Sequence, residues 1–531
     1  MTLSVMIQSV RGSLPRGSRV ALPLVAGLVS VITTPGAGAQ SLAELKVQLD
    51  ALQSKVAALE ARPTVNDALR DKLEKSPVIT LDQRGFRLAS PERTETRIVT
   101  GPDGQSYDQV VTVEEGDAYK FHLGALLQPQ GRFFIESPDD TSTFLMRRAR
   151  LIADGTVARN FDFLFQVDLL SSGLWVTNTA PANTVTVQDA WVNAKAWDWL
   201  QLRVGKMKSP IGIERWQSAN ARWFTDLITT TYLAPNRSIG AMLHGNVYGG
   251  VAQYWASLVN GEPDGGSSDL SSGGQNTKEF QGRLALTPFA RTDWEPLREL
   301  TVSAGVTYAP QLNGLGRYGT ANQQQFFTYN NGTINATQAN PGEQVRFVPN
   351  LTYFWGPFGL YAEAAWSTAG VTGATTGKVS KSTSVKDKNG KTVGTFNTTS
   401  TATNTSTTTE NFTNFAWQVA ASYMLTGEKN SFRAIKPNRP FSPSTGGWGA
   451  LQVAARAGQL TVDDGIFAAG YSDPSIWARQ STTFGAALNW ILNENLKLTL
   501  QYDYTSFLGG APDGANAPDN NAITTQVQLS F

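Results

Sequence analysis

Apolar and polar residues alternate along most of this chain from Tyr119 onward, and the pattern is clearest at its end. Within 523–531, Ile523, Val527 and Leu529 share one parity, and uncharged polar residues occupy the other. Because successive side chains of a strand point to opposite faces, this segment is predicted to be a strand with one apolar face. Taken alone it is typical of an edge strand in a soluble sandwich. In a transmembrane barrel the same apolar face would meet lipid.

The alternation recurs upstream, and this recurrence favours the barrel. An even number of alternating segments of about 10 residues suits a bacterial outer-membrane barrel, because closure leaves no free strand edge. The sequence therefore predicts an all-β fold, a 16-stranded antiparallel transmembrane β-barrel over residues 119–531. The sixteen predicted strands are 119–136, 145–157, 160–170, 184–195, 199–206, 237–246, 250–259, 278–289, 298–309, 343–355, 357–367, 412–426, 447–460, 477–491, 494–507 and 521–531.

The connections between these strands differ in length. Asn493-Glu494 and Gly356-Pro357 predict tight turns, which such barrels place on the periplasmic side, and long connections are expected outside. The long ones lie around 207–236, 310–342, 368–411 and 427–446. Segment 370–411 is rich in Thr, Ser and Gly, so it cannot bury a core and is predicted to be a mobile external loop.

The first 39 residues have the order of a secretory signal peptide. Arg11, Arg16 and Arg19 precede a short apolar run, and the small residues of 36–39 end it. The run is shorter than the ~20 residues that a membrane-spanning helix needs. Cleavage is predicted after Ala39, and it would remove three arginines and no acid, turning the formal net charge of +1 into −2. The mature chain is predicted to be exported to the outer membrane.

A short helix is predicted after the signal peptide, over 40–62. Its Leu and Val residues are spaced alternately three and four apart from Leu42 to Leu59, which is the seam of a coiled coil. A single amphipathic helix packed on its own domain is the alternative. Residues 63–118 are polar and are predicted to form a linker, with or without one hairpin.

Composition and chemistry exclude several functions. A formal net charge of +1 argues against nucleic acid as the main partner. The chain has no cysteine and only two histidines, His122 and His244, so thiolate chemistry is excluded and no catalytic set stands out. No enzyme activity, metal or cofactor is therefore predicted.

Seven arginines fall on the polar parity of their strands. An arginine facing lipid costs about 2–4 kcal/mol at mid-depth, so these side chains are predicted to face the lumen, where rings of cations favour anions. The alternative is that they pair with inward acids such as Asp168, Glu363 and Asp503 and hold loops against the wall. The seven candidates for an anion path are Arg132, Arg148, Arg150, Arg203, Arg283, Arg346 and Arg456.

Several blocks resemble the phosphate-selective porin O/P family of Gram-negative outer membranes, and their shared order carries the resemblance. They are Arg147-Arg148-Ala149-Arg150-Leu151, Asp189-Ala190-Trp191-Val192, the glycine-lysine-proline block from Val204 to Glu214, Arg237-Ser238-Ile239-Gly240, and the late blocks 423–428, 449–456 and 485–490.

This resemblance implies a trimeric, passive channel with small anionic solutes and outer-membrane lipid as partners. It also implies that Phe531 is the recognition signal for outer-membrane assembly. Strict phosphate selectivity is disfavoured, because the lumen parity is not rich in lysine. A competing function is a structural envelope protein whose barrel only anchors the coiled coil.

Overall fold

The computed structural model describes two units of the chain, 1–75 and 76–531, and each is considered by itself. In the first unit it describes residues 47, 50–51 and 54–55, all helical, so the predicted signal peptide and most of the predicted coiled coil lie outside the described residues. From residue 78 onward it describes all residues except 83–84, 91–92, 101–105, 115–118, 136–139, 171–184, 268–277, 312–313, 330–338, 387–391 and 406–408.

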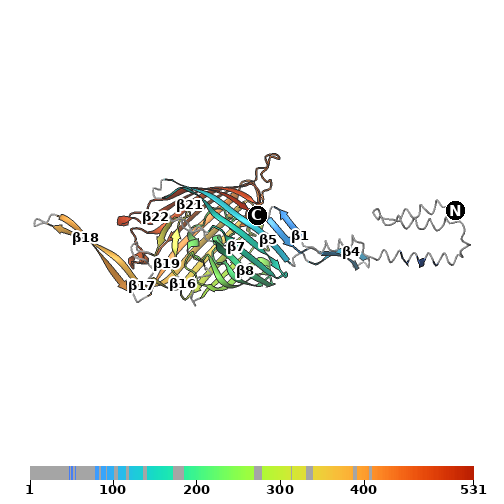
Figure 1. The fold of residues 1–531 in the computed structure, drawn as a ribbon, viewed down its shortest axis with the longest axis horizontal. Coiled ribbons are helices and arrows are strands. Elements are labelled where there is room, and N and C mark those ends of the chain that lie inside the picture. The colour runs from blue at the N-terminus through green and yellow to red at the C-terminus, as the bar shows by residue number, and fades with distance from the viewer. Residues whose placement is uncertain are drawn as a thin grey trace. The chain divides into compact units, whose positions relative to one another are not determined.

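Sixteen antiparallel strands close into a barrel, as the sequence predicts (Figure 1). Each strand pairs with the next in the chain, and the last pairs with the first from Asn521 opposite Ile135 to Ser530 opposite Leu126. The strands are β5 (Tyr119–Ile135), β6 (Thr143–Val157), β7 (Phe161–Asp168), β8 (Thr186–Trp197), β9 (Leu200–Lys208), β10 (Arg237–Val247), β11 (Ala252–Asn260), β12 (Lys278–Leu286), β13 (Thr301–Ala309), β16 (Ala339–Trp355), β17 (Phe358–Lys386), β19 (Glu410–Met424), β20 (Ala450–Thr461), β21 (Ala478–Ile491), β22 (Leu496–Gly509) and β23 (Asn520–Ser530).

Burial along these strands is the reverse of that in a soluble protein. On β23, Val527 is 42% exposed, whereas Thr524 is 2% and Gln526 is 5% exposed. On such strands the apolar side chains cover the outside of the barrel, and the polar ones face its interior. This arrangement suits a wall with lipid outside and a polar lumen inside. Among the described residues, there is no helix long and apolar enough to span a bilayer.

Short turns gather at one rim of the barrel, which the orientation of this class makes the periplasmic rim. Gly356-Pro357 between β16 and β17 is such a turn. The predicted loop 427–446 lies at this same rim, because it connects β19 to β20, so its prediction as an external loop is wrong. The backbone N–H of Asn430 donates to the carbonyl of Gly356 over 2.8 Å and fixes the loop beside that turn.

Two segments predicted to be irregular contain strands. The predicted external loop 370–411 is a hairpin, since β17 runs on to Lys386 and pairs with β18 (Thr392–Thr405); Figure 1 shows it extending beyond the barrel rim. The predicted linker 63–118 includes one hairpin of β1 (Val78–Asp82) and β2 (Gly85–Ala89) and another of β3 (Arg93–Thr100) and β4 (Ser106–Glu114). Strand β2 also pairs with β5 and so joins the barrel sheet.

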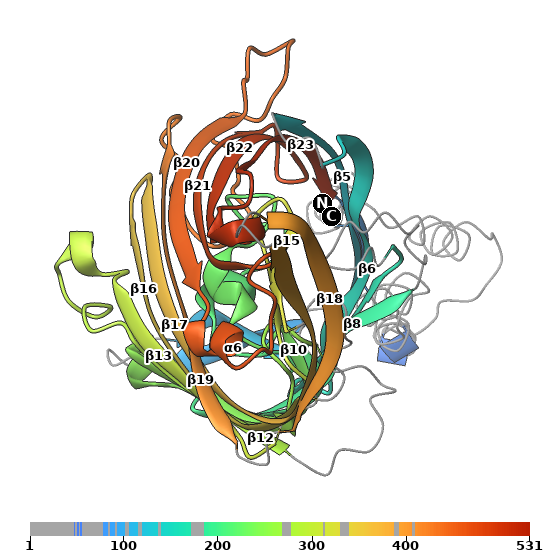
Figure 2. The same cartoon turned by 90° about the vertical axis from the view of Figure 1, so that its left-hand side faces the viewer.

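Short helices and one small hairpin complete the described elements. They are α5 (Ile213–Trp216), η1 (Thr229–Tyr232), η2 (Tyr248–Gly250), η3 (Glu295–Leu297), the hairpin of β14 (Arg317–Gly319) and β15 (Gln325–Thr328), α6 (Asp464–Ala468) and η4 (Pro512–Gly514). Figure 2 looks into the barrel and shows α6 and the green ribbon between β9 and β10 within the ring of strands. The lumen is therefore partly filled by the chain itself.

Candidate functional site

The connection between β9 and β10, residues 209–236, folds into the lumen and is called the inserted loop here. Most of its residues are buried. Inward side chains from many strands hold its backbone, so it bonds to much of the circumference of the wall. These bonds join Arg283 Nη1 to Pro210 O at 2.9 Å, Asn489 Nδ2 to Trp223 O at 2.9 Å, Thr225 N to Gln501 Oε1 at 2.8 Å, Gln528 Nε2 to Asn220 O at 2.9 Å and Arg456 Nη1 to Asp226 O at 2.6 Å.

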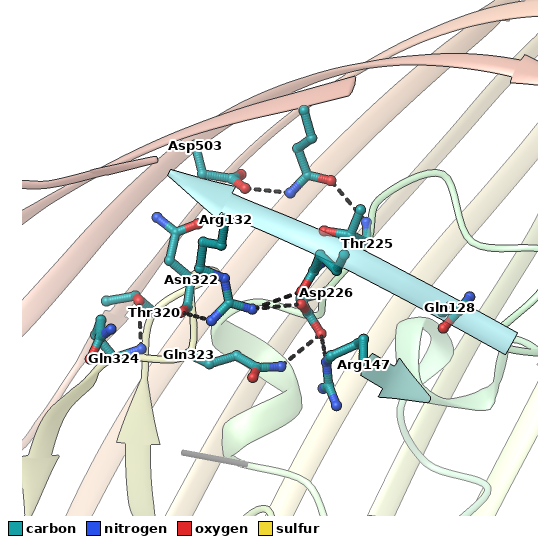
Figure 3. A network of polar contacts seen from close by, with 12 residues as sticks. Gln128, Arg132, Arg147, Thr225, Asp226, Thr320, Asn322, Gln323, Gln324 and Asp503 are labelled. Atoms are coloured by element: carbon teal, nitrogen blue, oxygen red, sulfur yellow. Dashed lines mark hydrogen bonds and ion pairs between the residues drawn. The ribbon is translucent and has the colours of Figure 1, made fainter. Parts of the chain in front are cut away.

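Asp226 of the inserted loop is the centre of one buried network (Figure 3). Its carboxylate accepts from Arg147 Nε at 2.8 Å and lies 3.5 Å from the guanidinium nitrogens of both Arg132 and Arg148. Gln323 Nε2 donates to it over 2.9 Å from the connection between β14 and β15. Charge-assisted bonds of this kind are about twice as strong as neutral ones. The network thus fixes the loop to β5 and β6.

A β-bulge at Arg147 allows two consecutive arginines to reach this carboxylate. The pairing of β5 with β6 passes from Gln128 opposite Arg148 to Pro129 opposite Met146, so Arg147 is the extra residue. A bulge interrupts the alternation of side chains. Met146 is exposed on the outer surface, whereas Arg147 and Arg148 both contact Asp226 in the lumen.

The charge of Asp226 is stabilised by these neighbours. Burial raises the pKa of its carboxyl. Arg147, Arg148 and Arg132 lower the pKa by more than burial raises it, and the net result is a pKa of about 2. The carboxylate is therefore ionised at neutral pH, as a group among three guanidiniums should be.

Two buried carboxylates hold the other side of the inserted loop. Glu363 of β17 accepts from the backbone N–H of Ile213 and, over 2.6 Å, from Thr230 Oγ1. Glu214 of the loop accepts from the backbone N–H of Ile228 at 3.3 Å and from Tyr361 at 3.2 Å. Gln418 Nε2 donates to both carboxylates. Both ends of the loop are thereby tied to β17 and β19.

An apolar core fills the lumen beside β16 to β21. Ile211 and Leu233 of the inserted loop pack with Tyr318 and Phe327 of the β14–β15 hairpin, and with Ile466 of α6. All five are buried, and the inward residues of the adjacent strands in this core are apolar as well, with Phe412 of β19 among them. Tight packing of this kind leaves no passage for solutes. Any passage has to lie on the opposite side of the lumen.

A cavity of about 520 Å³ lies on that opposite side, near the periplasmic rim. Its lining comes from β2, β5 to β7, β9, β10, the inserted loop, the β19–β20 connection, the β21–β22 turn and the end of β23 with Phe531. The lining is rich in cations and includes Arg87, Arg150, Lys208, Arg237 and Lys436. This is the open part of the lumen next to the inserted loop.

The seven predicted arginines are all found in or against the lumen, but their surroundings differ. Arg132 and Arg148 contact Asp226, and Arg150 Nε bonds Asp168 at 2.8 Å at the cavity wall. Arg203 lies over the ring of Trp191 at 4.1 Å. The other three are buried: Arg283 bonds Pro210 O, Arg346 pairs with Asp264 at 2.7 Å and Glu279 at 3.1 Å, and Arg456 pairs with Asp503 at 2.8 Å.

Several cations of the lumen were missed by reasoning from strand parity. Arg215 and Arg222 lie in the inserted loop, Arg147 lies at the bulge, and Lys208 and Arg237 flank the loop. Arg222 has no ion pair among the described residues, and its Nε atom has no hydrogen-bond partner there. The density of cations between residues 203 and 237 was the available signal. Within the part of the chain that is described, no group of His, Asp and Glu is arranged to hold a metal.

Comparison with known families decides the class of this protein. The family model for phosphate-selective porin O and P matches residues 130–531. The chain belongs to this family. The porin forms a diffusion channel of the outer membrane, and its family consists of channel proteins.

Solved structures similar to this porin are remote in sequence. The outer-membrane channel DcaP of Acinetobacter baumannii has 11% identity and a TM-score of 0.45, covering 78% of this chain and 98% of that one. The trimer form of OmpT of Vibrio cholerae has 11% identity and a TM-score of 0.43, with 78% and 100% covered. An anion-selective porin from Comamonas acidovorans has 9% identity and a TM-score of 0.42, with 78% and 100% covered. No curated protein matches the chain.

Proposed function

We propose that this porin prefers small anions and that they pass between the inserted loop and the wall of β6 to β10. The observation that carries the proposal is the group of cations gathered there, called the cation cluster. Its members are Arg147, Arg148, Arg150, Lys208, Arg215, Arg222 and Arg237. The carboxylates bonded within it belong to Asp168, Asp189 and Asp226, so positive charge is in excess.

Arg222 is the central member of this cluster. Its charge acts on Arg148, Lys208 and Lys497, and its own surroundings include Arg150 and Arg215. The side chain is only partly buried and forms no ion pair with a carboxylate among the described residues, although the charges of Glu214 and Asp226 also act on it. A fixed cation without a partner attracts a mobile anion, most strongly where the passage has low-dielectric walls.

The seven arginines predicted from the sequence divide into two groups under this proposal. Arg150 and Arg203 belong to the open side of the lumen and contribute to the anion path. The other five act as anchors, because each is buried against a carboxylate or a backbone carbonyl of a lumen segment; they are Arg132, Arg148, Arg283, Arg346 and Arg456. Strict selectivity for phosphate is not proposed, since three carboxylates remain within the cluster.

Replacing Arg222 by Gln tests the proposal. The reversal potential in a KCl gradient is measured on single channels, and the chloride-to-potassium permeability ratio is expected to fall several-fold in Arg222→Gln. Arg479→Gln is the matched control, because Arg479 is exposed and pairs with the exposed Asp464 at 3.5 Å. An unchanged ratio in Arg222→Gln would contradict the proposed path.

The alternative of a structural envelope protein also has a specific observation in its favour. The apolar core and the inserted loop together fill much of the lumen. If the barrel were only an anchor, purified protein in planar bilayers would give no conductance steps. The proposed channel requires discrete steps.

The assembly and the amino-terminal segments are proposed from the sequence. We propose a homotrimer, as the family resemblance implies, with the coiled coil of 40–62 joining the copies after cleavage at Ala39. A concave apolar surface on the outside of β5, β6 and β21 to β23 supplies a contact area, and its lining includes Gly131, Phe144 and Val527. Amino-terminal sequencing of the mature protein should begin at Gln40. Chemical cross-linking in membranes should give products that contain at most three copies of the chain.

A further inference from the structure

The amino-terminal hairpin of β1 and β2 completes the barrel wall at the periplasmic rim. Strand β23 ends where Phe531 exchanges backbone hydrogen bonds with Ala125 of β5, at 2.9 and 3.1 Å. From there β2 takes over the free edge of β5, with Phe86 opposite Leu123 and Ala89 opposite Lys120. The hairpin therefore extends the barrel wall toward the periplasm, past the point where β23 ends. It precedes the part that matches the family, which begins at residue 130.

This pairing places Arg87 in the channel. Arg87 lies directly opposite His122, and paired residues of neighbouring strands share a face. His122 has the inward parity of β5, shared with Gln128 and Gln130, and bonds Asp154 of β6 at 2.8 Å. Arg87 and His122 both line the periplasmic cavity. Arg87 itself forms no ion pair with any described residue.

Most other charges of the cavity lining are already paired. Arg150 is bonded to Asp168, Arg237 to Asp189, and Lys436 to Glu494 at 3.0 Å. Asp154 is held by His122, and Lys208 donates to the backbone carbonyls of Trp216 and Gln217. The lining also contains Phe531, the carboxy-terminal residue. Arg87 and Lys208 are thus the two cations of this lining that form no ion pair with a described carboxylate. Both can therefore bind an anionic solute.

The same cavity has a substantial apolar surface. Leu126 of β5, Ile152 of β6 and the residue Phe531 belong to its lining. Inorganic anions gain nothing from such surface, whereas an organic anion can bury its hydrocarbon part there while its charged group contacts a guanidinium. A pocket of about 520 Å³ is large enough for such a molecule.

We propose that this cavity is a binding site for organic carboxylates with an apolar body, and that Arg87 of the amino-terminal hairpin determines its specificity. The proposal rests on the proposed anion preference and names the solute class for it. The carboxylate contacts Arg87 and Lys208, and the apolar body lies against Ile152, Leu126 and Phe531. The site is at the periplasmic end of the path, so it selects among anions that the cation cluster admits.

Block of the chloride current by benzoate tests this site in the full-length channel. In wild type, benzoate should reduce the current at lower concentration than phosphate does. Arg87→Gln should raise the half-blocking concentration of benzoate roughly ten-fold, as expected for loss of one hydrogen-bonded charge. Ile152→Thr should weaken block by benzoate and leave block by acetate unchanged.

A control and a separate readout keep this test apart from the proposed function. Arg298→Gln removes an exposed guanidinium at the same rim, outside the cavity lining, and should leave benzoate block as in wild type. Equal block of wild type and Arg87→Gln, or phosphate block as strong as benzoate block, would overturn the carboxylate site. The reversal potential in KCl is recorded on the same channels. A cation-selective wild type contradicts the anion preference itself. An anion-selective wild type whose benzoate block is unaltered in Arg87→Gln contradicts this site alone.

Discussion

Arg147 Nε, at a bulge in strand β6, donates a 2.8 Å hydrogen bond to Asp226 Oδ1 in the loop inserted into the lumen. Arg132 and Arg148 contact the same carboxylate, so one acidic side chain joins a loop to two strands of the wall. The position of the passage depends on this loop. Its attachment can therefore be tested by changing a single residue.

Asp226→Asn is expected to loosen the inserted loop. The substitution leaves three buried guanidiniums without their carboxylate, and breaking a buried pair in this way costs on the order of 3–5 kcal/mol. Open-channel current noise should rise. The barrel should also unfold at a lower temperature in detergent, which is followed by its heat-modifiable migration in gel electrophoresis. Asp464→Asn is the control, since Asp464 is exposed. A variant with the current noise and the unfolding temperature of wild type would show that Asp226 does not hold the loop.

The same carboxylate predicts how the channel responds to acid. Its pKa is about 2 in the folded protein, below the ordinary value of 3.8. A lowered pKa means that the stabilisation is fully present above about pH 4 and is lost as the pH falls through about 2. The difference in current noise between wild type and Asp226→Asn should therefore be constant between pH 7 and pH 4 and should shrink only below that range. A difference that disappears near pH 6 would assign this control of the loop to another group.

Gly305 of β13 allows the inserted loop to lie against the wall. A Cβ atom at this position would lie 2.7 Å from the Cβ atom of Ile211, which is closer than such atoms approach. Gly305→Ala should push Ile211 away and change the single-channel conductance. The matched control is Gly282→Ala on β12, where the nearest atom is 3.3 Å away and belongs to the side chain of Phe280. Equal conductance in both variants would mean that the loop tolerates displacement there.

Arg346 separates a structural role from a role in selectivity. It is fully buried and pairs with both Asp264 and Glu279. Arg346→Gln leaves two buried carboxylates unpaired and should destabilise the barrel by on the order of 3–5 kcal/mol. Channels that do assemble should keep the wild-type reversal potential, and thermal unfolding in detergent measures the stability. A changed permeability ratio at wild-type stability would instead place Arg346 on the anion path.

The wall of the barrel could be predicted from the sequence, whereas its contents could not. The alternation of residues in β23 and the similar segments upstream reflect a repeating environment, lipid on one side and lumen on the other, and therefore appear in the sequence itself. The inserted loop has no such period. Its burial depends on contacts such as Gln501 with Thr225 and Asn489 with Trp223, which join residues far apart in the chain.

Single-residue irregularities limited the prediction of the site. Parity places Arg148 and Arg150 in the lumen but assigns Arg147 to the outside, and only the bulge reverses that assignment. Arg222 lies in a connection to which strand parity does not apply. Parity also finds Arg346 and Arg456 inside the barrel but cannot show that Asp264 and Asp503 neutralise them.

The reversal potential of the wild-type channel in a KCl gradient tests the central claim most directly. If the cation cluster around Arg222 sets the selectivity, the reversal potential will have the sign expected of a channel that is more permeable to chloride than to potassium. A potential of the opposite sign, with potassium favoured, would contradict the claim.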